Sequence, residues 1–382
     1  MWYGAENMNV VINALAFKKN SSGIGVLISE LLIRYCGKSK RTCQIVLSQD
    51  SPKVTPAGEH VQTIYSPYSH KQGIRRILFQ SLSFGQTYCK NAVLLTTDSK
   101  VPFFLPKSCR LVPVVTDLAL LRMPEVYQAS RVLIWRLQYR YLLKKTARYI
   151  AISQFTKDEM VALLHLDPSK IDVVYCAADA RYRRVEDAGE LALIREKYAL
   201  DKPYILFVGN ANPRKNLGRL MRAFDLAKEQ GDFPFELILA GEYGWKFDRA
   251  AALSGLKHAA DIRFLDFVSD ADMPQLYSAA SLFAFPTLYE GFGIPLIEAQ
   301  RCGVPVLAGN VSSMPEVGGK NSAFYVDPLS EEDIASGLRA VLLNPERAKE
   351  LVARGYENAA RFDWDQSAEQ LQTIVETLIQ QG

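Results

Sequence analysis

Two glutamates, Glu290 and Glu298, have the spacing in this chain that most clearly indicates chemistry. They stand eight residues apart, and two glycines, Gly291 and Gly293, closely follow the first of them. Carboxylates accept hydrogen bonds from hydroxyl groups, so the pair could hold two hydroxyl-bearing parts of one ligand. The glycines remove side chains that would keep a ligand away from the backbone. The alternative is an ordinary loop acid followed by an ordinary helix acid.

The residues around the glutamates predict a strand, a loop and a helix. We expect the strand to end at Phe285 and the helix to begin near Ile294, with Pro295 in its first turn. The first backbone N–H groups of a helix have no partner within it and attract anions such as pyrophosphate. Glu290 would lie on the loop and Glu298 two turns into the helix. This setting favours a binding site over two unrelated surface acids.

The rest of the chain alternates between short apolar runs and stretches with apolar residues at helical spacing. This order is typical of α/β folds with a doubly wound parallel sheet. A strand over 9–17, the glycine turn 23–25 and a helix open the first half, and a second such series starts at Tyr204. Further strands are expected over 44–48, 92–96, 111–115, 149–152, 204–208, 235–240, 261–265, 282–285 and 304–308.

The length of 382 residues suits two domains, and a polar stretch places the linker near residues 180–190. Ligands of such sheets bind beyond the carboxyl ends of the strands. A cleft between the two domains is therefore the expected active site. The tail, over 364–381, is predicted to be one amphipathic helix.

The sequence resembles glycosyltransferase family 4, a group of retaining transferases that use sugar nucleotides. The resemblance covers most of the chain and is strongest over 285–306. It also rests on residues 23–25, 153–157, 173–179, 207–217, 241–245, 264–270 and 312–317. It implies a GT-B fold with two Rossmann-like domains: residues 1–183 bind the acceptor, residues 184–362 bind the nucleotide sugar, and a helix over 363–382 packs back on the first domain.

The resemblance also implies roles for individual residues. Glu290 would hydrogen-bond hydroxyls of the donor sugar, and Glu298 would bind the ribose. Lys215, with Arg214 beside it, would neutralise the pyrophosphate, where charge develops as the leaving group departs. For these two cations the alternative is a solvated loop pair. Donor binding is further implied for Asn210, Gly291, Phe292, Gly293 and Ile294.

Other positions carry weaker implications. Gly23 and Gly25 would let the first loop approach the phosphates, although a tight turn alone explains them. Phe267 and Val268 would lie beside the nucleotide base, with core packing as the alternative. Asp117 is included among the catalytic candidates because it stands in a motif of the family.

Two departures from the family pattern stand out. Many members carry His-Asp-Leu after the strand that ends near Val115, but this chain has Thr116-Asp117-Leu118. In relatives that histidine lies near the sugar and phosphate of the donor, so its replacement puts the contact in doubt and indicates a different sugar, such as a 6-deoxyhexose. Positions 176 and 177 read Cys-Ala where Asn-Gly is usual, which we interpret as a structural change near the linker.

No cofactor or metal ion is expected. The six cysteines show no C-x-x-C pair and the four histidines no ligand spacing, so reduced and mostly buried thiols are predicted. Asp363-Trp-Asp365 has the form of the metal-binding D-x-D motif of another glycosyltransferase class, but we interpret it as a chance match at the start of the tail helix. No residue stands out as a nucleophile. The family's retaining outcome is usually explained by same-face attack, in which the departing phosphate oxygen takes the acceptor's proton.

Charge is unevenly distributed along the chain. Residues 1–180 carry 23 basic and 12 acidic residues, a net charge of +11, whereas residues 181–382 carry a net charge of −7. Basic residues beside apolar and aromatic ones predict amphipathic helices that face an anionic membrane or the acceptor. An ordinary solvated basic face is the alternative, and nucleic acid is disfavoured because no binding motif accompanies the charge. The basic residues concerned are Arg75, Arg76, Arg136, Arg140, Lys144 and Lys145.

The resemblance implies transfer of a hexose to a hydroxyl of a lipid-linked or growing bacterial polysaccharide such as O-antigen, and it leans toward mannosyltransferases. Mannose from GDP-mannose is the favoured donor; a 6-deoxyhexose such as rhamnose, or a UDP-sugar, is the alternative. A non-catalytic scaffold that binds sugar nucleotides is the rival from another class. A phosphorylase would require a pyridoxal-binding lysine motif, which is not found.

The sequence also carries expectations about location. Residues 1–7 lack the basic start and apolar run of a secretory signal and are interpreted as a loose leader. No window is apolar for long enough to span a membrane. We therefore expect a cytoplasmic protein, with peripheral attachment to the inner face of the plasma membrane left open.

Overall fold

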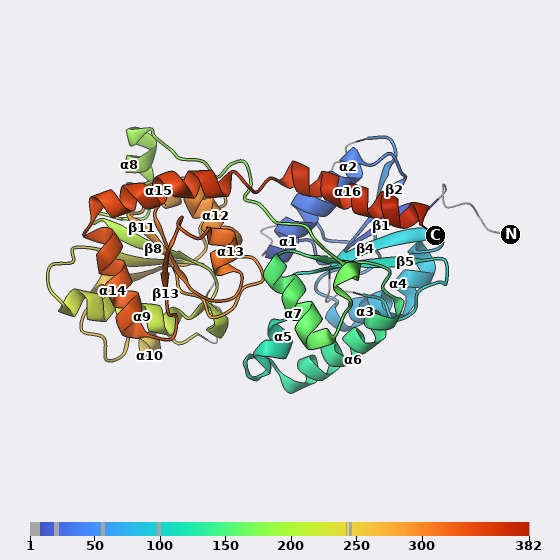
Figure 1. Cartoon of the computed structure of the whole chain (residues 1–382), viewed down its shortest axis with the longest axis horizontal. Coiled ribbons are helices and arrows are strands. Elements are labelled where there is room, and N and C mark those ends of the chain that lie inside the picture. The colour runs from blue at the N-terminus through green and yellow to red at the C-terminus, as the bar shows by residue number, and fades with distance from the viewer. Residues whose placement is uncertain are drawn as a thin grey trace. The chain divides into compact units, whose positions relative to one another are not determined.

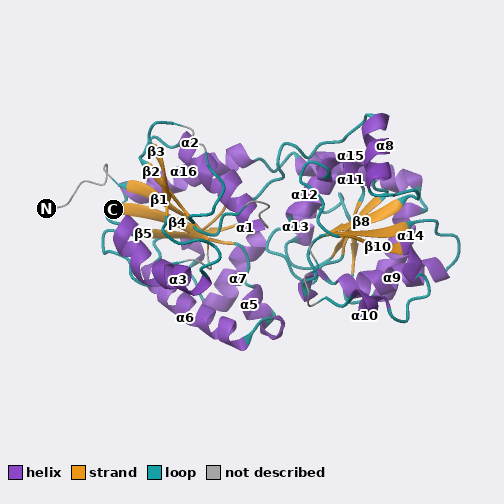
Figure 2. Ribbon diagram, turned by 180° about the vertical axis from the view of Figure 1, so that it is seen from behind, coloured by secondary structure: helices purple, strands orange, loops and turns teal. Residues whose placement is uncertain are grey.

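The computed structural model describes residues 8–18, 23–54, 58–97, 101–241, 243 and 247–381. The chain divides into two compact units (Figure 1): residues 1–176 with 363–382, and residues 177–362. Each unit contains a parallel sheet with helices on both faces (Figure 2). This arrangement confirms the predicted α/β class with two doubly wound sheets. The proposed leader, residues 1–7, lies outside the described residues.

The first unit is built on a seven-stranded sheet in the order β3-β2-β1-β4-β5-β6-β7. Its described strand pairs are parallel. The central strands are continuous apolar runs, because helices cover both faces of the sheet. The strands are β1 (Asn9–Ala14), β2 (Cys43–Leu47), β3 (Val61–Tyr65), β4 (Ala92–Thr97), β5 (Arg110–Val115), β6 (Tyr149–Ala151) and β7 (Ile171–Val173).

Helices of the first unit bury one face against this sheet. Two of them are interrupted by π-helical turns, Leu27–Ile33 and Phe79–Ser83, which join α1 to α2 and α3 to α4. The helices are α1 (Gly23–Val26), α2 (Arg34–Lys38), α3 (Gly73–Leu78), α4 (Phe84–Tyr88), α5 (Ala119–Arg122), α6 (Ala129–Lys145), α7 (Gln154–Leu164) and α16 (Trp364–Gln380).

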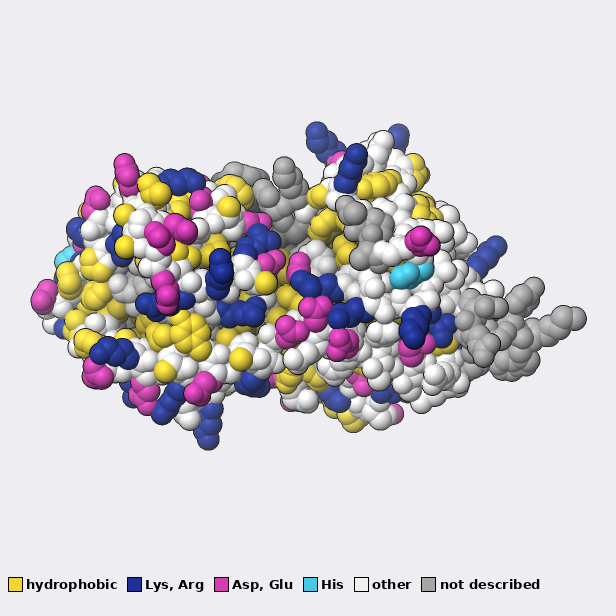
Figure 3. Space-filling view, turned by 90° about the horizontal axis from the view of Figure 1, so that it is seen from above, with side chains coloured by type: hydrophobic (Ala, Val, Ile, Leu, Met, Phe, Trp, Pro, Cys, Tyr) yellow, Lys and Arg dark blue, Asp and Glu magenta, His cyan; other side chains and the backbone are white. Residues whose placement is uncertain are grey.

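The tail helix α16 packs on the first unit although it follows the second unit in sequence. Arg41 pairs with Glu376 at 2.7 Å, and Lys38 on α2 pairs with Glu369 at 2.9 Å. The hydroxyl of Ser367 donates to the backbone carbonyl of Tyr175 at 2.8 Å. Acidic and basic side chains accordingly alternate on the face that carries α16 (Figure 3).

The second unit is built on a six-stranded parallel sheet in the order β10-β9-β8-β11-β12-β13. Its strands are β8 (Tyr204–Val208), β9 (Glu236–Ala240), β10 (Ile262–Leu265), β11 (Leu282–Phe285), β12 (Val306–Gly309) and β13 (Phe324–Val326). Its helices are α8 (Ala188–Lys197), α9 (Leu217–Glu229), α10 (Arg249–Leu253), α11 (Met273–Ser278), α12 (Ile294–Arg301), α13 (Met314–Gly318), α14 (Glu331–Leu342) and α15 (Pro345–Ala359).

The two units divide at residue 176 rather than at the predicted 183. Residues 177–187 form no helix or strand, but they are tied to the second unit. The guanidinium of Arg301 donates to the carbonyl of Ala178 at 2.8 Å, and the Val185 amide donates to Ser278 at 3.1 Å. Polar composition indicated a linker here, but it did not reveal these contacts.

Candidate active site

Glu290 is buried on the loop between β11 and α12 and accepts bonds from two cations. Its Oε1 lies 2.7 Å from Nζ of Lys215, and its Oε2 lies 3.4 Å from Nη1 of Arg214. The hydroxyl of Thr287 also donates to Oε1, at 3.4 Å. The structure therefore brings together three residues that are 75 or 76 positions apart in sequence and that the sequence analysis had assigned to the same ligand.

The charge state of Glu290 follows from these contacts. Burial alone would raise its pKa, because it removes the carboxylate from water. The ammonium of Lys215 and the guanidinium of Arg214 outweigh burial and hold the pKa below its ordinary value. Glu290 is thus a buried anion whose neighbouring cations keep it ionised at neutral pH.

The loop that carries the two cations is fixed to the glutamate loop by a dense set of hydrogen bonds. The carbonyl of Arg214 accepts from the Leu288 amide at 2.8 Å and from the Thr287 hydroxyl at 2.9 Å. Buried Asn216 donates from its side chain to the carbonyls of Pro286, at 2.9 Å, and Pro328, at 2.6 Å. The two loops therefore form one rigid surface.

Lys215 is held from a second side by an aromatic ring. Its Nζ lies 4.6 Å from the centre of the Phe285 ring, at the end of β11. Such a cation–π contact stabilises a cation that is removed from water. The side chain of Lys215 is 12% exposed, so its charge is shielded from bulk solvent but remains within reach of a ligand on the loop surface.

Helix α12 begins where the sequence predicts it. Gly293 precedes the helix with φ +94°, a conformation that side-chain-bearing residues rarely adopt. Ile294 opens the helix and is half-buried. The ring of Phe292 is buried and packs edge-on against Phe362 at 5.4 Å, so its side chain belongs to the core. Gly291 is buried as well.

Glu298, on α12, is hydrogen-bonded to a buried tyrosine. The hydroxyl of Tyr277, on α11, donates to its Oε2 at 3.0 Å. Burial raises the pKa of Glu298 to about 7, while hydrogen bonds from Tyr277 and Tyr182 favour the ionised form and limit the rise. Glu298 therefore changes charge near neutral pH, unlike Glu290.

Three further donor-site predictions lie on loops of the second unit. Asn210 is exposed after β8. Phe267 is 53% exposed after β10, so core packing is the wrong interpretation of this residue. Val268, in contrast, is buried and belongs to the hydrophobic core of the unit. Core packing, the alternative left open for both, therefore holds for Val268 alone. Positions 242, 244 and 245 of the block 241–245 lie outside the described residues.

The donor-site residues predicted in the first unit follow two of its strands, β1 and β5, in sequence. Gly23 and Gly25 belong to the first turn of α1, rather than to the turn before a helix as predicted. Asp117 follows β5, and its Oδ1 accepts from the amide of Ala119, the first residue of the short helix α5, at 2.9 Å. Thr116, beside it, is half-buried.

The predicted basic residues differ in their surroundings. Arg75 and Arg136 are exposed, whereas Arg76 is half-buried and donates to Nδ1 of His70 at 2.7 Å. The side chains of the remaining three, Arg140, Lys144 and Lys145, lie outside the described part of the structure. On α6 the apolar side chains of Leu133, Ile134 and Leu137 are exposed as well.

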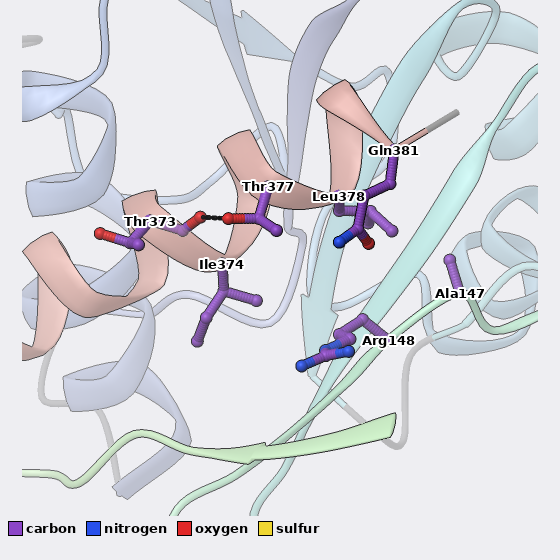
Figure 4. A pocket seen from close by; sticks show the side chains of 7 residues that line it. All are labelled: Ala147, Arg148, Thr373, Ile374, Thr377, Leu378 and Gln381. Carbon is purple, nitrogen blue, oxygen red and sulfur yellow. Dashed lines mark hydrogen bonds between the residues drawn. The ribbon is translucent and has the colours of Figure 1, made fainter. Parts of the chain in front are cut away.

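A pocket of the first unit contains none of the predicted residues (Figure 4). It is lined by Ala147, Arg148, Thr373, Ile374, Thr377, Leu378 and Gln381. Arg148 is paired with Asp172 at 2.6 Å, and the Thr377 hydroxyl donates to the carbonyl of Thr373 at 2.8 Å. Arg148 and the two threonines are thus engaged within the protein, and the pocket adds nothing to the candidate site.

Three general features complete the description. Across the described residues, no group of histidine, cysteine or acidic side chains could hold a metal ion. Five of the six cysteines are buried, and Cys109 is half-buried. Within the same residues, no helix has the length and apolar character needed to cross a bilayer.

Several residues of the site had no role in the sequence analysis. Asn216 and Thr287 join the two loops, and the Ser313 hydroxyl donates to the carbonyls of Glu290 and Phe292 at 2.9 and 3.0 Å. Tyr277 orients Glu298. Asn216 has a left-handed φ of +61°, a conformation that asparagine tolerates better than most residues. An asparagine directly before an expected helix could therefore have indicated this turn. Nothing in the sequence around Tyr277 indicated that its hydroxyl would reach Glu298.

Comparison with known proteins identifies this arrangement. A sequence model described as "Glycosyl transferases group 1" matches residues 192–358, which contain both glutamates and both cations. The O-antigen chain mannosyltransferase B of Escherichia coli is 31% identical over 266 residues, 69% of each chain. The chain belongs to this glycosyltransferase family. It is accordingly a glycosyltransferase, as predicted.

Further comparisons support the fold and extend the relationship. The serotype-specific mannosyltransferase WbdA of Escherichia coli is 30% identical over 223 residues, 57% of this chain but 27% of that longer protein. The sucrose-phosphate synthase structure from Thermosynechococcus elongatus superposes with a TM-score of 0.78 at 17% identity, covering 98% of this chain and all of that one. The GT-B fold predicted from the resemblance is thereby confirmed.

Proposed function

We propose that this glycosyltransferase moves mannose from GDP-mannose to a hydroxyl of a lipid-linked or growing bacterial polysaccharide such as O-antigen. The observation that carries the proposal is the convergence of Lys215 and Arg214 on buried Glu290 beside the start of α12. The mannosyltransferase names of the relatives in Escherichia coli support the choice of sugar. The same names support a glycan acceptor.

The two cations would bind the diphosphate of the donor. A diphosphate needs positive charge when its bond to the sugar breaks, because that charge stabilises the leaving group. Lys215 and Arg214 supply two cations on one rigid loop, and the first N–H groups of α12 are of the kind that binds phosphate oxygens. These groups could serve without a metal ion.

Glu290 would accept hydrogen bonds from hydroxyls of the mannose. In the structure Lys215 lies 2.7 Å from it, so a bound diphosphate would compete for the ammonium. The donor would therefore draw Lys215 toward the phosphates while its sugar hydroxyls take the vacated sites on the carboxylate. Glu298 would accept from the ribose, and the exposed ring of Phe267 would stack on the base.

The proposed reaction retains the configuration of the sugar. The bond between the anomeric carbon and the diphosphate oxygen breaks, and the acceptor oxygen forms a bond to that carbon on the same face. The proton of the acceptor hydroxyl passes to the departing phosphate oxygen. The protein then contributes positioning and electrostatic stabilisation. Gly23, Gly25 and Asp117 are proposed to act on the donor from the first unit.

Two other classes of donor are alternatives to GDP-mannose. Thr116 in place of histidine favours a 6-deoxyhexose donor, because the contact made by that histidine would be lost. A UDP-sugar is the other. The scaffold hypothesis is not favoured, since the chain belongs to a family of enzymes and has both glutamates, with two cations at Glu290.

Isothermal titration of the full chain with GDP, UDP and dTDP tests the base, and the sugars of the best base then test the hexose. We expect GDP to bind most tightly and GDP-mannose to be turned over with a glycan acceptor. Product analysis by NMR should show the retained anomeric configuration, and chelators should leave the rate unchanged. Tighter binding of UDP or dTDP, or an inverted product, would overturn the corresponding part of the proposal.

A further inference from the structure

Three connecting segments of the first unit meet at one edge of its sheet. Strands β1, β2 and β3 are adjacent and parallel, so the segments that follow them begin at the same edge. These segments are the turn at 15–18, residues 48–51 and the loop at 66–72. Ligands of such sheets bind beyond this edge. The turn at 15–18 leads in sequence to Gly23, which the proposed function places beside the donor.

The turn at 15–18 is held by hydrogen bonds to its backbone carbonyls. The Ser48 hydroxyl donates to the carbonyl of Leu15 at 2.8 Å, and the Ser51 hydroxyl donates to the carbonyl of Phe17 at 2.8 Å. Both serines are buried. A serine hydroxyl donates without carrying a charge, so these two bonds do not depend on pH in the ordinary range.

His70 and Arg76 bind the same two carbonyls. Nε2 of His70 lies 2.9 Å from the carbonyl oxygen of Phe17, and Nη1 of Arg76, on α3, donates to the carbonyl of Leu15 at 3.4 Å. Nη1 of Arg76 also donates to Nδ1 of His70 at 2.7 Å. The His70 amide donates to Oδ1 of Asp50 at 2.7 Å, which fixes the backbone that carries the ring. The side chain of His70 is 10% exposed, so water has little access to these bonds.

The contacts of His70 define its protonation state. A guanidinium can only donate, so Nδ1 must accept the bond from Arg76 and carries no proton. A carbonyl oxygen can only accept, so Nε2 must carry the proton of the neutral ring. A proton added to Nδ1 would break the bond from Arg76 and set two cationic donors against each other. The arrangement therefore requires a neutral imidazole.

Charged groups on three segments act on this imidazole. Burial is the largest cause that lowers its pKa, and the cations of Arg76, on α3, and Lys18, in the turn, add to it. Asp50, whose Oδ1 lies 3.8 Å from Nε2, acts in the opposite direction, as does the carbonyl of Phe17. The pKa of His70 lies below its ordinary value as a result. The ring is neutral at pH 7 and takes up a proton only as the solution becomes acidic.

We propose that neutral His70 is a positioning residue for the donor site: with Arg76 it holds the turn at 15–18, and thereby the start of α1, for binding of the nucleoside diphosphate sugar. Protonation of His70 would break its bond from Arg76 and loosen the turn. The inference rests on the proposed function, which sets Gly23 and Gly25 against the donor. It also gives Arg76 a different role from the acceptor or membrane contact expected from its charge.

Donor affinity measured over pH tests the proposal in His70→Gln and His70→Ala. Glutamine can donate to the carbonyl of Phe17 but does not titrate. His70→Gln should therefore bind donor within about threefold of the wild type at neutral pH and lose less affinity on acidification. His70→Ala, which cannot donate, should bind about threefold to tenfold more weakly at neutral pH. The ratio of variant to wild-type affinity cancels the titration of Glu298, which all these proteins share.

Arg76→Met gives a second, independent readout. Loss of this cation makes protonation of His70 easier, so the decline of donor affinity on acidification should begin at higher pH than in the wild type. His60→Gln is the matched control. Nε2 of His60 lies 3.1 Å from the carbonyl oxygen of Cys36, a comparable bond, but His60 precedes β3 and lies at the other end of that strand. This control should follow the wild type at every pH, and thermal unfolding establishes that each variant is folded.

Nitrogen NMR of the imidazoles tests the arrangement without any donor. The chain has four histidines, and the spectrum of His70→Gln identifies the signals of His70. We expect the Nε2–H tautomer and a protonation midpoint below that of an ordinary histidine, about 6.5. An Nδ1–H tautomer, or a ring already protonated at neutral pH, would overturn the proposal.

Two binding results would also overturn it: an affinity of His70→Ala equal to that of the wild type, or the same decline on acidification in His70→Gln and the wild type. Failure of the proposed function has a different signature. The wild type would then bind no nucleoside diphosphate at any pH, which would overturn the positioning role as well, while the NMR result would stay the same.

Discussion

Glu290 contacts two cationic side chains, Lys215 and Arg214, and can therefore both accept hydrogen bonds and neutralise their charge. In the absence of donor it neutralises Lys215 at 2.7 Å and Arg214 at 3.4 Å. Removing its charge therefore has two opposite effects. The sugar loses its acceptor, but the diphosphate meets cations that are no longer neutralised.

Glu290→Gln is expected to lower kcat by about 100-fold or more while tightening binding of the nucleoside diphosphate by about threefold to tenfold. Steady-state kinetics and calorimetry measure the two effects. Glu346→Gln is the matched control, because Glu346 is 83% exposed and pairs only with Lys349 among the described residues. Loss of diphosphate affinity in Glu290→Gln would show that Glu290 does not compete for Lys215.

Glu298 is expected to make stability depend on pH. Its pKa rises from 4.5 to about 7 on folding, chiefly because of burial. The folded state therefore binds more protons than the unfolded state between these values, and stability falls as pH rises through that window. Glu298→Gln should remove this loss and gain on the order of 2 kcal/mol relative to the wild type above pH 7. Denaturant unfolding of both proteins at a series of pH values measures this gain. If the difference in unfolding free energy between variant and wild type is the same at pH 5 and pH 8, the prediction is wrong.

The hydroxyl of Tyr277 gives a related prediction about binding. It donates to Glu298 at 3.0 Å and so favours the carboxylate. If the ribose needs that carboxylate, donor affinity should rise with pH near 7, and Tyr277→Phe should move the midpoint of this rise to higher pH. Titrating the donor over pH measures the midpoint. A lower affinity with the same midpoint would indicate a structural role alone.

At the scale of elements, the glycines at two helix starts have different structural requirements. Gly293, before α12, has φ +94°, whereas a Cβ added to Gly23, at the start of α1, would meet nothing within 4 Å. Gly293→Ala is expected to cost about 1–2 kcal/mol of stability from backbone strain.

Gly23→Ala is expected to leave stability unchanged or raised by about 0.5–1 kcal/mol, because alanine favours the helix. If the donor approaches this backbone, affinity should nevertheless fall, since the open space would be filled. Thermal unfolding and donor titration separate the two effects. Wild-type affinity in the Gly23→Ala variant would exclude Gly23 from the donor site.

Strands whose sequences are continuously apolar could be predicted, even the three-residue β6, whereas β3, β7 and β13 could not. Both faces of β4, β8 and β11 are covered, so their sequences are continuously apolar. Strand β3 lies at the edge and mixes buried with exposed residues, and two of the three residues in each of β7 and β13 are only half-buried.

For the candidate site, the local structure could be predicted from the sequence, but the contacts between distant residues could not. The spacing of Glu290 and Glu298 and the glycines between them indicated a loop and a helix start, and both are present. The sequence could not reveal that Lys215 is paired with Glu290, because that contact depends on how β8 and β11 align in the sheet. Nor could it reveal that Tyr277 would reach Glu298 from a neighbouring helix.

At the scale of the whole molecule, the return of α16 to the first unit links the stability of that unit to the end of the sequence. Trp364, Leu371, Val375 and Ile379 of this helix are buried. Ending the chain at Phe362 should destabilise the first unit by at least about 5 kcal/mol, because the helix no longer covers it.

The second unit should be affected less by that truncation, since its core lies within residues 177–362. Thermal unfolding followed by calorimetry would then show loss of one transition and retention of another. Nucleoside diphosphate should still raise the midpoint of the retained transition. Equal destabilisation of both transitions would contradict this division of the chain.

The position of α16 also sets an order on the ribosome. Residues 177–362 are synthesised before residues 363–381, so the second unit can complete its core while the first still lacks a helix. Folding of nascent chains commonly proceeds from the N-terminal domain onward. Here the unit that begins first is finished last, and until then its uncovered apolar face is open to chaperones.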